Sequence, residues 1–344
     1  MGAGAMTEPT IPGLDLERLA ATLAGPLDLD PSLPLEAALI GGGRSNITVG
    51  LRQGHRDWVL RRPPLGRRLA TAHDMAREFA VLSGLEGTAV PAPRPLFHGD
   101  DEGVIGAEFY VMERVDGRIL RAPRDVDLDP AEARRASLAL VETLAAIHAV
   151  DFEAAGLAPL GRPDGYAERQ VRRWIGQLDS GIQVTPGMRE LAARLQAAVP
   201  ASTRAALVHG DYRIDNVVLD REDPGRIAAV LDWEMATIGD PLADLGMLVM
   251  YWCRPGDRCA SEVHEITTAP GFLERDELIA AYAAATGADL ADLDFFVALA
   301  HFKLAVIVAG IGARMAAGDT LGEGFEQIAQ IPDVLVARGL EVEL

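Results

Sequence analysis

The sequence predicts an α+β fold in which a small strand-rich N-terminal lobe precedes a larger helical C-terminal lobe. Strand patterns cluster early in the chain, at residues 35–40, 47–52 and 58–61, and are separated by glycine-containing or polar turns. From about residue 130 onward, apolar positions recur at helical spacing instead. The 344 residues are enough to bury a large core, and this length suggests two domains or lobes.

The N-terminal lobe is expected to contain two helices besides its strands. Apolar residues recur at helical spacing over residues 14–24, ahead of the strands, and over 71–85 after them. Phe109–Glu113 is predicted as a further strand, and residues 115–117 as the connector that leaves it.

The C-terminal lobe is expected to be mainly helical and to contain one hairpin. Asp129-Pro130 marks the start of its first helix, because proline is well tolerated in a first helical turn. The hairpin is expected to pair Val217–Leu219 with Ile227–Leu231. Further helical patterns cover residues 165–179, 187–199, 275–286 and 291–310.

The composition is that of a globular protein, with 49% hydrophobic and 24% charged residues. The net charge of −19 argues against nucleic-acid binding, which usually requires a basic surface. This charge serves solubility, or it favours a cationic substrate. Two cysteines, Cys253 and Cys259, are too few for a disulfide framework or a metal cluster, and we expect free thiols.

The cellular compartment is expected to be the cytoplasm. No basic segment followed by an apolar core stands at the N-terminus, so the sequence shows no secretory signal. The longest apolar stretch, residues 304–312, is too short to cross a bilayer. We therefore expect a cytoplasmic protein with no membrane partner.

The strongest chemical signal is the segment His209-Gly-Asp-Tyr-Arg-Ile-Asp-Asn216, followed by Asp232. Asp211 lies in a loop, Asn216 starts the next strand, and Asp232 ends the partner strand of the hairpin. A carboxylate can accept a proton from a hydroxyl, and an amide and a second acid supply the hard oxygen ligands that Mg²⁺ prefers. The set is typical of phosphoryl transfer, in which the protein mainly positions groups and neutralises charge.

Each of these residues alone could be an ordinary turn residue, because Asp and Asn are common in turns. The combination of Asp211, Asn216 and Asp232 on one strand–turn–strand frame favours the catalytic interpretation. His209 could fix the loop by bonding to nearby backbone, or it could act directly in the chemistry. The sequence leaves both roles open.

The segments 207–216 and 230–245 resemble motifs of the aminoglycoside phosphotransferase family, which shares a protein-kinase-like fold with the choline kinases. The resemblance extends over nearly the whole chain. It implies a bilobal protein-kinase-like fold with an N-terminal antiparallel-sheet lobe and a larger helical C-terminal lobe. Residues 12–112 would form the nucleotide-binding N-lobe, 113–120 the hinge, and 121–344 the C-lobe with the catalytic loop and the acceptor pocket.

The resemblance also implies the use of ATP and Mg²⁺ and assigns roles on the transfer side. Asp211 would be the catalytic base, while Asn216 and Asp232 would hold Mg²⁺. Asp240 and Asp244 match trailing acids that more often support the loop in this family than touch substrate.

A glycine-rich segment resembles the loop that lies over the nucleotide phosphates in this family. Gly42, Gly43, Ser45 and Asn46 belong to it, and the absence of a Cβ on its glycines lets backbone N–H groups approach a phosphate. A glycine run between strands is also the pattern of a plain turn.

Arg61 occupies the position where kinase-like enzymes carry a phosphate-binding lysine. Arginine also binds phosphate, through a planar fork rather than a point charge, and Arg62 could substitute for it. Glu78, on the following helix, is the expected ion-pair partner of Arg61, with an exposed helix glutamate as the alternative. Met112 and Glu113 resemble the hinge, whose backbone would bind the adenine edge.

The acceptor is expected to be a hydroxyl of a small molecule. Only Trp233–Gly239 separates Asp232 from Asp240, which is too short for the activation segment on which protein kinases bind peptides. An aminoglycoside, which is a polycation, would suit an acidic helical lobe.

Three segments resemble more closely a branch of the family that is associated with acyl-CoA dehydrogenases: residues 59–64, 111–117 and 233–241. This resemblance implies a hydroxyacyl-CoA or a similar metabolite as acceptor. Two groups of arginines could bind such an anion, or could instead face ATP or solvent: Arg61, Arg62, Arg67 and Arg68, and Arg172 and Arg173 beside Trp174.

Three hypotheses therefore remain for the function. The first is an ATP- and Mg²⁺-dependent small-molecule O-phosphotransferase. The second is a non-catalytic nucleotide-binding protein with a kinase-like fold, which the arginine at position 61 suggests. The third is a protein kinase, which the short segment after Asp232 disfavours.

Overall fold

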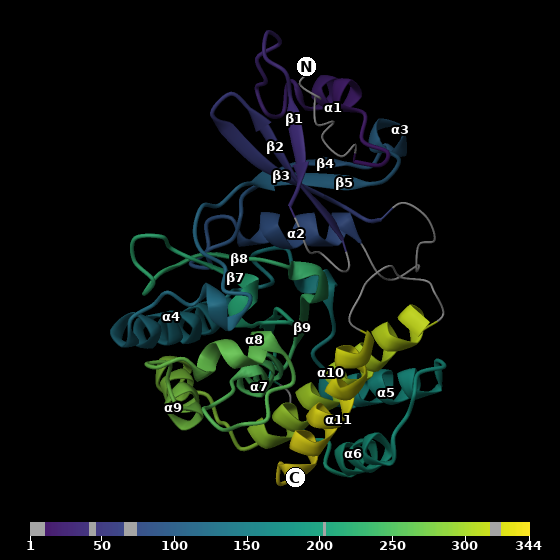
Figure 1. Cartoon of the computed structure of the whole chain (residues 1–344), viewed down its shortest axis with the longest axis vertical. Coiled ribbons are helices and arrows are strands. Elements are labelled where there is room, and N and C mark those ends of the chain that lie inside the picture. Colours follow the sequence, from purple (N-terminus) through teal and green to yellow (C-terminus); the bar gives the residue numbers. More distant parts are fainter. Residues whose placement is uncertain (1–10, 41–45, 65–73, 202–203, 317–324) are drawn as a thin grey trace, which may run out of the picture. The chain divides into compact units, whose positions relative to one another are not determined.

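The protein has an α+β structure that divides into two compact units (Figure 1). The computed structural model describes residues 11–40, 46–64, 74–201, 204–316 and 325–344. Unit 1 comprises Met1–Gly87 and Ala92–Val115, and unit 2 comprises Thr88–Pro91 and Asp116–Leu344. The predicted fold class is confirmed, because unit 1 is built on an antiparallel sheet and unit 2 is mainly helical. The roles assigned to the two lobes remain predictions.

Unit 1 contains a five-stranded antiparallel sheet with the strand order β1-β2-β3-β5-β4. Its strands are β1 (Glu36–Leu39), β2 (Ile47–Gln53), β3 (Arg56–Arg62), β4 (Pro95–Gly99) and β5 (Phe109–Glu113). Its helices are α1 (Leu16–Leu23), α2 (Met75–Leu85) and α3 (Glu102–Ile105). The sequence predicted all of these except β4 and α3.

The alternation of side chains along β3 and β5 separates an apolar face of the sheet from a polar one. Trp58 and Leu60 of β3 join Phe109 and Val111 of β5 in a buried cluster that also includes α1 and α3 residues. Arg61 lies opposite Tyr110 in the register of the two strands, so both point to the other face of the sheet.

Unit 2 consists of helices and two short antiparallel strand pairs, β6 with β9 and β7 with β8. Its main helices are α4 (Pro130–His148), α5 (Tyr166–Gly176), α6 (Pro186–Ala197), α7 (Leu242–Tyr251), α8 (Glu262–Glu265), α9 (Arg275–Thr286), α10 (Leu293–Ala316) and α11 (Phe325–Glu341). Its strands are β6 (Ala206–Val208), β7 (Val217–Leu219), β8 (Ile227–Val230) and β9 (Thr237–Gly239).

The start of α4 follows from its local sequence. The Asp129 carboxylate accepts the N–H of Glu132 at 2.8 Å, and the Glu132 carboxylate accepts the N–H of Asp129 at 3.0 Å. Pro130 occupies the first helical position, where its missing N–H costs nothing. These contacts confirm the predicted helix start.

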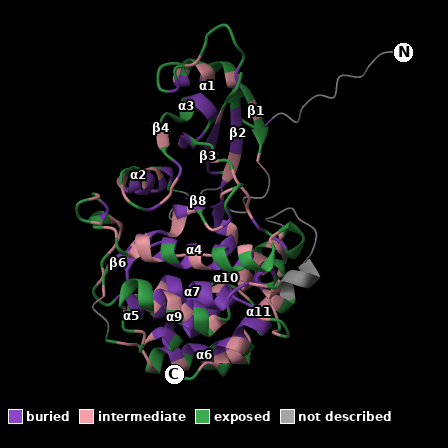
Figure 2. Cartoon of the chain, turned by 90° about the vertical axis from the view of Figure 1, so that its left-hand side faces the viewer, coloured by how far each residue is buried: buried purple, intermediate pink, exposed green. Residues whose placement is uncertain are grey.

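Helices α7, α8 and α11 of unit 2 escaped the sequence prediction. Helix α8 has only four residues, too few to show a helical period. Helix α7 is buried along nearly its whole length, so its apolar residues mark no single face (Figure 2). Helix α11 contains Pro332, a residue that usually ends a helical pattern.

Helix α10 is longer than the apolar stretch considered in the sequence. Within the described part of the chain, its residues Leu293–Met315 are long and apolar enough to cross a membrane. The most apolar window of this segment is 61% buried inside the protein, and the helix packs against α7 and α11. These contacts are those of a core helix.

Candidate active site

A strand–loop–strand frame in unit 2 brings the predicted transfer residues together. Strand β6 leads into the loop, and a single 3₁₀ turn, Ile214–Asn216, leads into β7. The hairpin returns through β8, and the N–H of Leu231 donates to the carbonyl of Asn216 at 2.8 Å. Asp232 therefore follows directly after a residue that is paired with Asn216. Strand β9 then closes the frame by pairing with β6.

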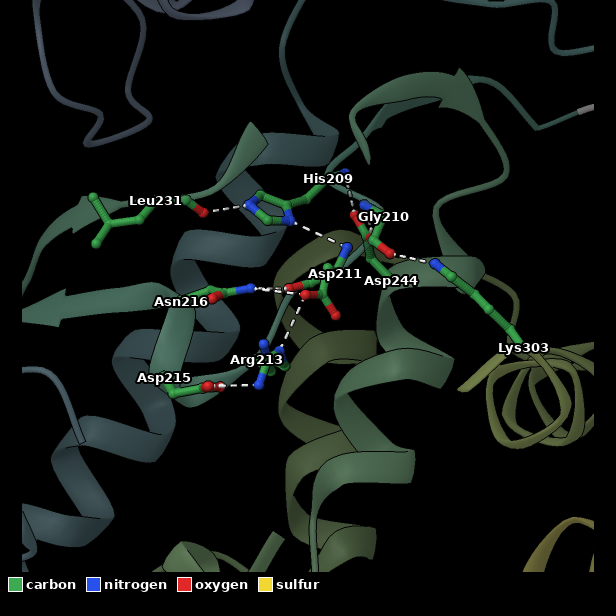
Figure 3. A network of polar contacts seen from close by, with 9 residues as sticks. All are labelled: His209, Gly210, Asp211, Arg213, Asp215, Asn216, Leu231, Asp244 and Lys303. Carbon is green, nitrogen blue, oxygen red and sulfur yellow. Dashed lines mark hydrogen bonds and ion pairs between the residues drawn. The ribbon is translucent and has the colours of Figure 1, made fainter. Parts of the chain in front are cut away.

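The carboxylate of Asp211 is held by two side chains of the same loop (Figure 3). Its Oδ2 accepts from Nδ2 of Asn216 at 3.0 Å and from Nε of Arg213 at 3.1 Å. Nδ2 of Asn216 also donates to the backbone carbonyl of Asp211 at 2.8 Å. The Asp211 side chain keeps 24% of its surface exposed. The carboxylate is thus oriented but still accessible to a reacting hydroxyl.

Asn216 and Asp232 supply oxygen atoms of the kind that Mg²⁺ prefers. Nδ2 of Asn216 is engaged with Asp211, so its Oδ1 is directed away from that carboxylate. Asp232 has φ 67° and ψ 58°, a left-handed conformation that is uncommon for a residue with a side chain. Among the described residues, no three His, Cys, Asp or Glu side chains gather as a metal cluster. A metal ion here would therefore depend on further ligands, such as substrate phosphates and water.

His209 connects the loop to the hairpin through hydrogen bonds. The ring is fully buried and packs on Trp233 with the ring centroids 4.6 Å apart. Its Nδ1 accepts the backbone N–H of Asp211 at 3.2 Å, and its Nε2 lies 2.8 Å from the carbonyl of Leu231. This network assigns the proton to Nε2. Both ring nitrogens are therefore used to join the loop to the hairpin, which favours the first of the two roles considered for this residue.

Asp244, at the start of α7, anchors the loop through its backbone. Its two carboxylate oxygens accept the N–H groups of His209 at 2.6 Å and Gly210 at 2.7 Å. Burial would raise the pKa of Asp244, but the hydrogen bond and charge of His148 and the other contacts outweigh it, so the pKa is lowered. The carboxylate is thus kept ionised in a fully buried position. Its supporting role agrees with the expectation from the sequence.

Gly210 is required at its position for two reasons. It has φ +84°, which disfavours side chains, and a Cβ would lie 2.6 Å from the carbonyl oxygen of Met235. Its own carbonyl accepts a hydrogen bond from Nζ of Lys303 on α10 at 2.5 Å. Helices α7 and α10 therefore both hold this turn of the loop.

Arg213 joins two carboxylates of the loop. Its Nη1 donates to Oδ2 of Asp215 at 2.5 Å, in addition to the Asp211 bond, and its guanidinium lies 5.1 Å from the ring centre of Tyr251. Burial raises the pKa of Asp215 to about 6, and the neighbouring charge of Asp211 adds to this, while Arg213 opposes it. Oδ1 of Asp215 is buried and has no hydrogen-bond partner among the residues that the structure describes.

Asp240 has a supporting role of another kind. It is buried, accepts the N–H of Leu242 at 3.0 Å and pairs with Nε of Arg204 at 3.1 Å. The residue thereby caps the entry to α7, the helix that carries Asp244.

In unit 1, three residues surround Glu78 of α2 and form a buried cluster with it. Oε1 of Glu78 accepts from Nδ2 of Asn46 at 2.9 Å, and Oε2 accepts from the hydroxyl of Tyr110 at 2.9 Å. Nη1 of Arg61 lies 3.3 Å from Oε2, and its side chain is 11% exposed. The expected Arg61–Glu78 ion pair is confirmed, and the exposed alternative for Glu78 is wrong because only 1% of it is accessible.

Arg62 does not share this environment. It points to the opposite face of the sheet, is fully buried, and donates from Nη2 to the carbonyl of Pro12 at 2.5 Å. Burial lowers the pKa of Arg62. Arg61 is therefore the one of the two arginines that meets Glu78.

The remaining predicted nucleotide-binding residues are only partly described. Gly42, Gly43 and Ser45 lie outside the described residues. Met112 is buried in β5, and the N–H of Glu113 donates to the carbonyl of Arg94 at 2.9 Å. That amide is thus already engaged, and the adenine contact of this segment stays a prediction.

A small cavity of about 30 Å³ lies beside the loop within unit 2. It reaches Gly210 and is walled by apolar and aromatic side chains of α5, α7 and α10, among them Trp174, Met247 and Phe296. Among the described residues that line it, Lys303 is the one cation and none is acidic. Nζ of Lys303 lies 5.8 Å from the Trp174 ring centre. Such a volume holds a group about the size of a water molecule or a methyl group.

Of the two arginines before Trp174, one faces solvent and the other lies over the Trp174 ring. Arg172 is exposed and pairs with Glu168 at 2.6 Å, as on a solvated helix face. Arg173 lies 5.1 Å above the ring of the buried Trp174. Arg67 and Arg68 lie outside the described residues.

Lys303 was the main residue that sequence reasoning missed. It is the only lysine in a chain that otherwise uses arginine for its basic residues, and it interrupts an apolar helix. Both features are visible in the sequence and could have marked it. Asn46 was assigned to phosphate binding only, whereas its contact with Glu78 links residues that are 32 positions apart.

Comparisons with known proteins identify the relatives of the chain. The profile of the phosphotransferase enzyme family matches residues 36–296. Acyl-CoA dehydrogenase family member 11 of Gallus gallus is 36% identical over 334 residues, which cover 95% of this chain and 43% of the relative. The chain thus spans less than half of the length of this curated relative.

Two solved structures are also similar. A candidate aminoglycoside phosphotransferase from Ralstonia eutropha has a TM-score of 0.79 and 29% identity, with 96% of this chain and 99% of that chain covered. A thermostable aminoglycoside phosphotransferase mutant, in a ternary complex with AMP-PNP and hygromycin B, has a TM-score of 0.62 at 16% identity, with 94% and 99% covered. The second likeness shows a shared fold.

Proposed function

The chain belongs to the phosphotransferase enzyme family, and from this premise we propose that it is a small-molecule kinase. It transfers the γ-phosphoryl group of ATP, with Mg²⁺, to a hydroxyl group of a small molecule. The observation that carries this proposal is the Asp211 carboxylate, which is oriented by Asn216 and Arg213 on a loop anchored by Asp244.

Asp211 acts as the general base. It accepts the proton of the acceptor hydroxyl, whose oxygen forms a bond to the γ-phosphorus while the bond from that phosphorus to ADP breaks. The products are ADP, a phosphate ester and a protonated Asp211. A positioned base contributes roughly 10²- to 10⁴-fold to such a rate. Arg213 stays bonded to Oδ2 and keeps the other carboxylate oxygen directed to the acceptor.

Asn216 and Asp232 would hold Mg²⁺ together with the nucleotide phosphates. The ion would neutralise charge that develops on the transferring group. Oδ1 of Asn216 fits this task because Nδ2 is already used. The left-handed backbone of Asp232 supports a functional assignment, since strained conformations concentrate at such sites.

The nucleotide is proposed to contact unit 1. Arg61, oriented by Glu78, would bind the α- and β-phosphates with its guanidinium fork. Gly42, Gly43, Ser45 and Asn46 would cover the phosphates, and the backbone of Met112 and Glu113 would meet the adenine. The AMP-PNP bound to the related aminoglycoside phosphotransferase supports the choice of an adenine nucleotide.

A small acceptor is favoured over a peptide by the segment between Asp232 and Asp240. Its seven residues are taken up by a 3₁₀ turn, Trp233–Met235, and by strand β9, which pairs with β6. This leaves no free segment on which a peptide could lie. The protein-kinase hypothesis is therefore disfavoured within unit 2 itself.

The cavity beside Gly210 holds only a methyl-sized group, so its charge bears on the surroundings of the loop rather than on a whole acceptor. An aminoglycoside is a polycation and would need carboxylates, whereas this cavity presents Lys303 and apolar walls. We therefore favour a hydroxyacyl-CoA or a similar metabolite with an apolar chain. The similarity to acyl-CoA dehydrogenase family members supports the same choice.

A non-catalytic nucleotide-binding protein is the second candidate. The arginine at position 61 motivated it, because kinase-like enzymes usually carry lysine there. The Arg61–Glu78 pair weakens this argument, since arginine makes the ion pair that orients a phosphate-binding cation.

The test is an ADP-release assay with ATP and Mg²⁺ against aminoglycosides, amino alcohols and hydroxyacyl-CoA compounds. We expect turnover with a hydroxyacyl compound and a phosphate ester detectable by mass spectrometry. Asp211→Asn should lower kcat/KM by about 10²- to 10⁴-fold and retain ATP binding in calorimetry. Glu222→Gln, at an exposed hairpin position, is the matched control.

The outcomes separate the candidates. ATP binding without turnover on any acceptor would favour the non-catalytic protein. Full turnover by Asp211→Asn would remove the role of general base. Turnover with aminoglycosides alone would overturn the acceptor class while leaving the phosphotransferase assignment intact.

A further inference from the structure

Unit 2 contains a second and larger cavity, of about 200 Å³, among helices α7, α9, α10 and α11. These helices pack against one another in pairs, α10 with α7 and α11, and α7 with α9. The residues that line it are Val249, Arg275, Val297, His301, Arg338, Glu341 and Val342. None of them belongs to the catalytic loop or to the cavity beside Gly210.

Two arginines give this cavity a positive charge that is only partly compensated. Arg275 donates from Nε to the carbonyl of Trp252 at 2.7 Å and pairs with Asp257. Arg338 has one described partner, the thiol of Cys253, which lies 3.5 Å from Nη1. Within the described residues no carboxylate lies at ion-pair distance from Arg338. Glu341, the one acid in the lining, is exposed.

His301 adds a buried polar group to the same wall. It is 3% exposed, and its Nδ1 has no hydrogen-bond partner in the described part of the chain. Burial lowers the pKa of His301, and the charges of Arg338 and Arg275 lower it further. Arg275 is affected in the same way, because burial and the charge of Arg338 lower its pKa against the opposing effect of Asp257. Positive charge therefore predominates around these two side chains.

We propose that this cavity is a binding site for a small oxyanion, with the Arg338 guanidinium as its principal donor and Arg275 and His301 beside it. A guanidinium binds a carboxylate or a phosphate through two parallel N–H bonds. Among the described residues, Arg338 offers such a fork with no carboxylate at ion-pair distance and with the Cys253 thiol as its one hydrogen-bond partner. The bound anion would also supply the negative charge that Arg338 lacks among the described residues.

The size and the walls of the cavity limit the ligand. An apolar cavity of roughly 150 Å³ is known to hold benzene, so about 200 Å³ holds a molecule of comparable or slightly larger size. Inorganic phosphate fits this space, and so does a four-carbon dicarboxylate. The valines of the lining favour the dicarboxylate, because they can pack against its methylene groups.

Thermal unfolding of the full chain at pH 7 tests the site. Sodium phosphate and sodium succinate are titrated separately, each against sodium chloride at equal ionic strength, because salt alone changes stability. A specific ligand at about tenfold its Kd should raise the Tm by roughly 2–4 °C in a saturable manner. Calorimetry with succinate and phosphate gives the two affinities and shows which oxyanion is preferred.

Arg338→Gln is the decisive variant. Because Arg338 has no carboxylate partner in the described part of the chain, its loss should not lower the Tm in chloride. The variant should nevertheless lose the response to both anions. His301→Phe keeps a ring in the wall and should weaken binding about tenfold. Arg189→Gln, at an exposed position of α6, is the matched control and should respond like the wild type.

The result that overturns the proposal is an equal response of wild type and Arg338→Gln, or no response beyond that in chloride. If Arg338→Gln fails to fold, the same decision falls to His301→Phe and to wild-type calorimetry. Because no ATP and no acceptor is present, failure of this proposal is distinguishable from failure of the proposed kinase activity.

Discussion

The loop of residues 209–216 in unit 2 and the Glu78 cluster of unit 1 are both polar networks, but they are assembled differently. The loop holds Asp211 with residues from one continuous frame, and its anchor Asp244 binds backbone N–H groups. The Glu78 cluster joins side chains from β3, β5, α2 and the segment before β2. This difference has a consequence for substitutions. Removing the anchor Asp244 should displace the backbone of the loop, whereas removing a side chain of the Glu78 cluster should weaken only the contact that this side chain makes.

The largest effect is expected for Asp244→Asn. The substitution replaces one acceptor by an amide N–H₂ that faces the N–H of His209 or Gly210. We expect the free energy of unfolding to fall by about 2–4 kcal/mol. We also expect kcat to fall by about 10²-fold, because small misplacements of a catalytic group are costly. Urea unfolding and the ADP-release assay measure the two effects.

The pH dependence provides the control for this variant. The pKa of Asp244 is lowered, so its ionised form stabilises the wild type above the ordinary carboxylate pKa, and this stability is lost as the pH falls through the lower value. The stability difference between wild type and Asp244→Asn should therefore shrink in acid. A constant difference, or a similar loss in the exposed Asp276→Asn, would contradict the anchor role.

Asp215 is expected to behave in the opposite direction. Its pKa is raised to about 6, so the folded state binds an extra proton between about pH 4 and 6. The stability is fully present below the unfolded-state pKa and is lost as the pH rises through about 6. Asp215→Asn should remove this loss, which amounts to about 3 kcal/mol. Urea unfolding at pH 4.5 and 7.5 measures this effect. The free energies of unfolding of wild type and Asp215→Asn should lie close together at pH 4.5 and differ more at pH 7.5.

The two networks also differ in how far the sequence could predict them. The segment from His209 to Asp232 is continuous, so its spacing alone indicated one frame, and the structure brings Asp211 and Asn216 into contact. Lys303 and Gly210 are 93 positions apart, and Tyr110 and Glu78 are 32 apart. Their contacts depend on how helices and strands pack. Pairing across such distances leaves no local periodicity, although the single lysine was a visible signal.

Strands and helices were likewise predictable where they depend on local sequence and not where they depend on a distant partner. Helix α4 was predicted because Asp129, Pro130 and Glu132 form its start locally. Strands β6 and β9 were not, because each has only three residues and is defined by its partner. The assignments of Asp211, Asn216 and Asp232 to catalysis and metal binding remain predictions.

Arg61→Ala tests the Glu78 cluster of unit 1. If Arg61 binds nucleotide phosphates, the loss of charged hydrogen bonds of about 1.5–3 kcal/mol should raise the KM for ATP by roughly 10- to 100-fold. The value of kcat should change less, because the loop is built without this residue. Arg61→Lys should retain part of the affinity. The exposed Arg52→Ala, on the same sheet, is the control, and an equal change in both variants would refute the phosphate contact.

Lys303→Met should have the smallest effect. It tests whether the loop needs the hydrogen bond from Lys303 in addition to its anchor Asp244. The variant loses the bond to the Gly210 carbonyl but keeps most of the apolar volume beside Trp174. Burial lowers the pKa of Lys303, so its charge is costly and its removal should leave stability nearly unchanged. We expect a fall in kcat/KM of about fivefold, equivalent to roughly 1 kcal/mol.

The acceptor identifies which contact of Lys303 matters. A loss confined to the KM of anionic acceptors would mean that the ammonium group binds the acceptor, whereas an equal loss in kcat for all acceptors would mean that it positions Gly210. Because the chain has one lysine, reductive methylation with ¹³C labels only Lys303 and the terminal amine. The NMR titration of the labelled Lys303 measures its pKa directly. An ordinary lysine pKa would contradict the buried environment of this side chain.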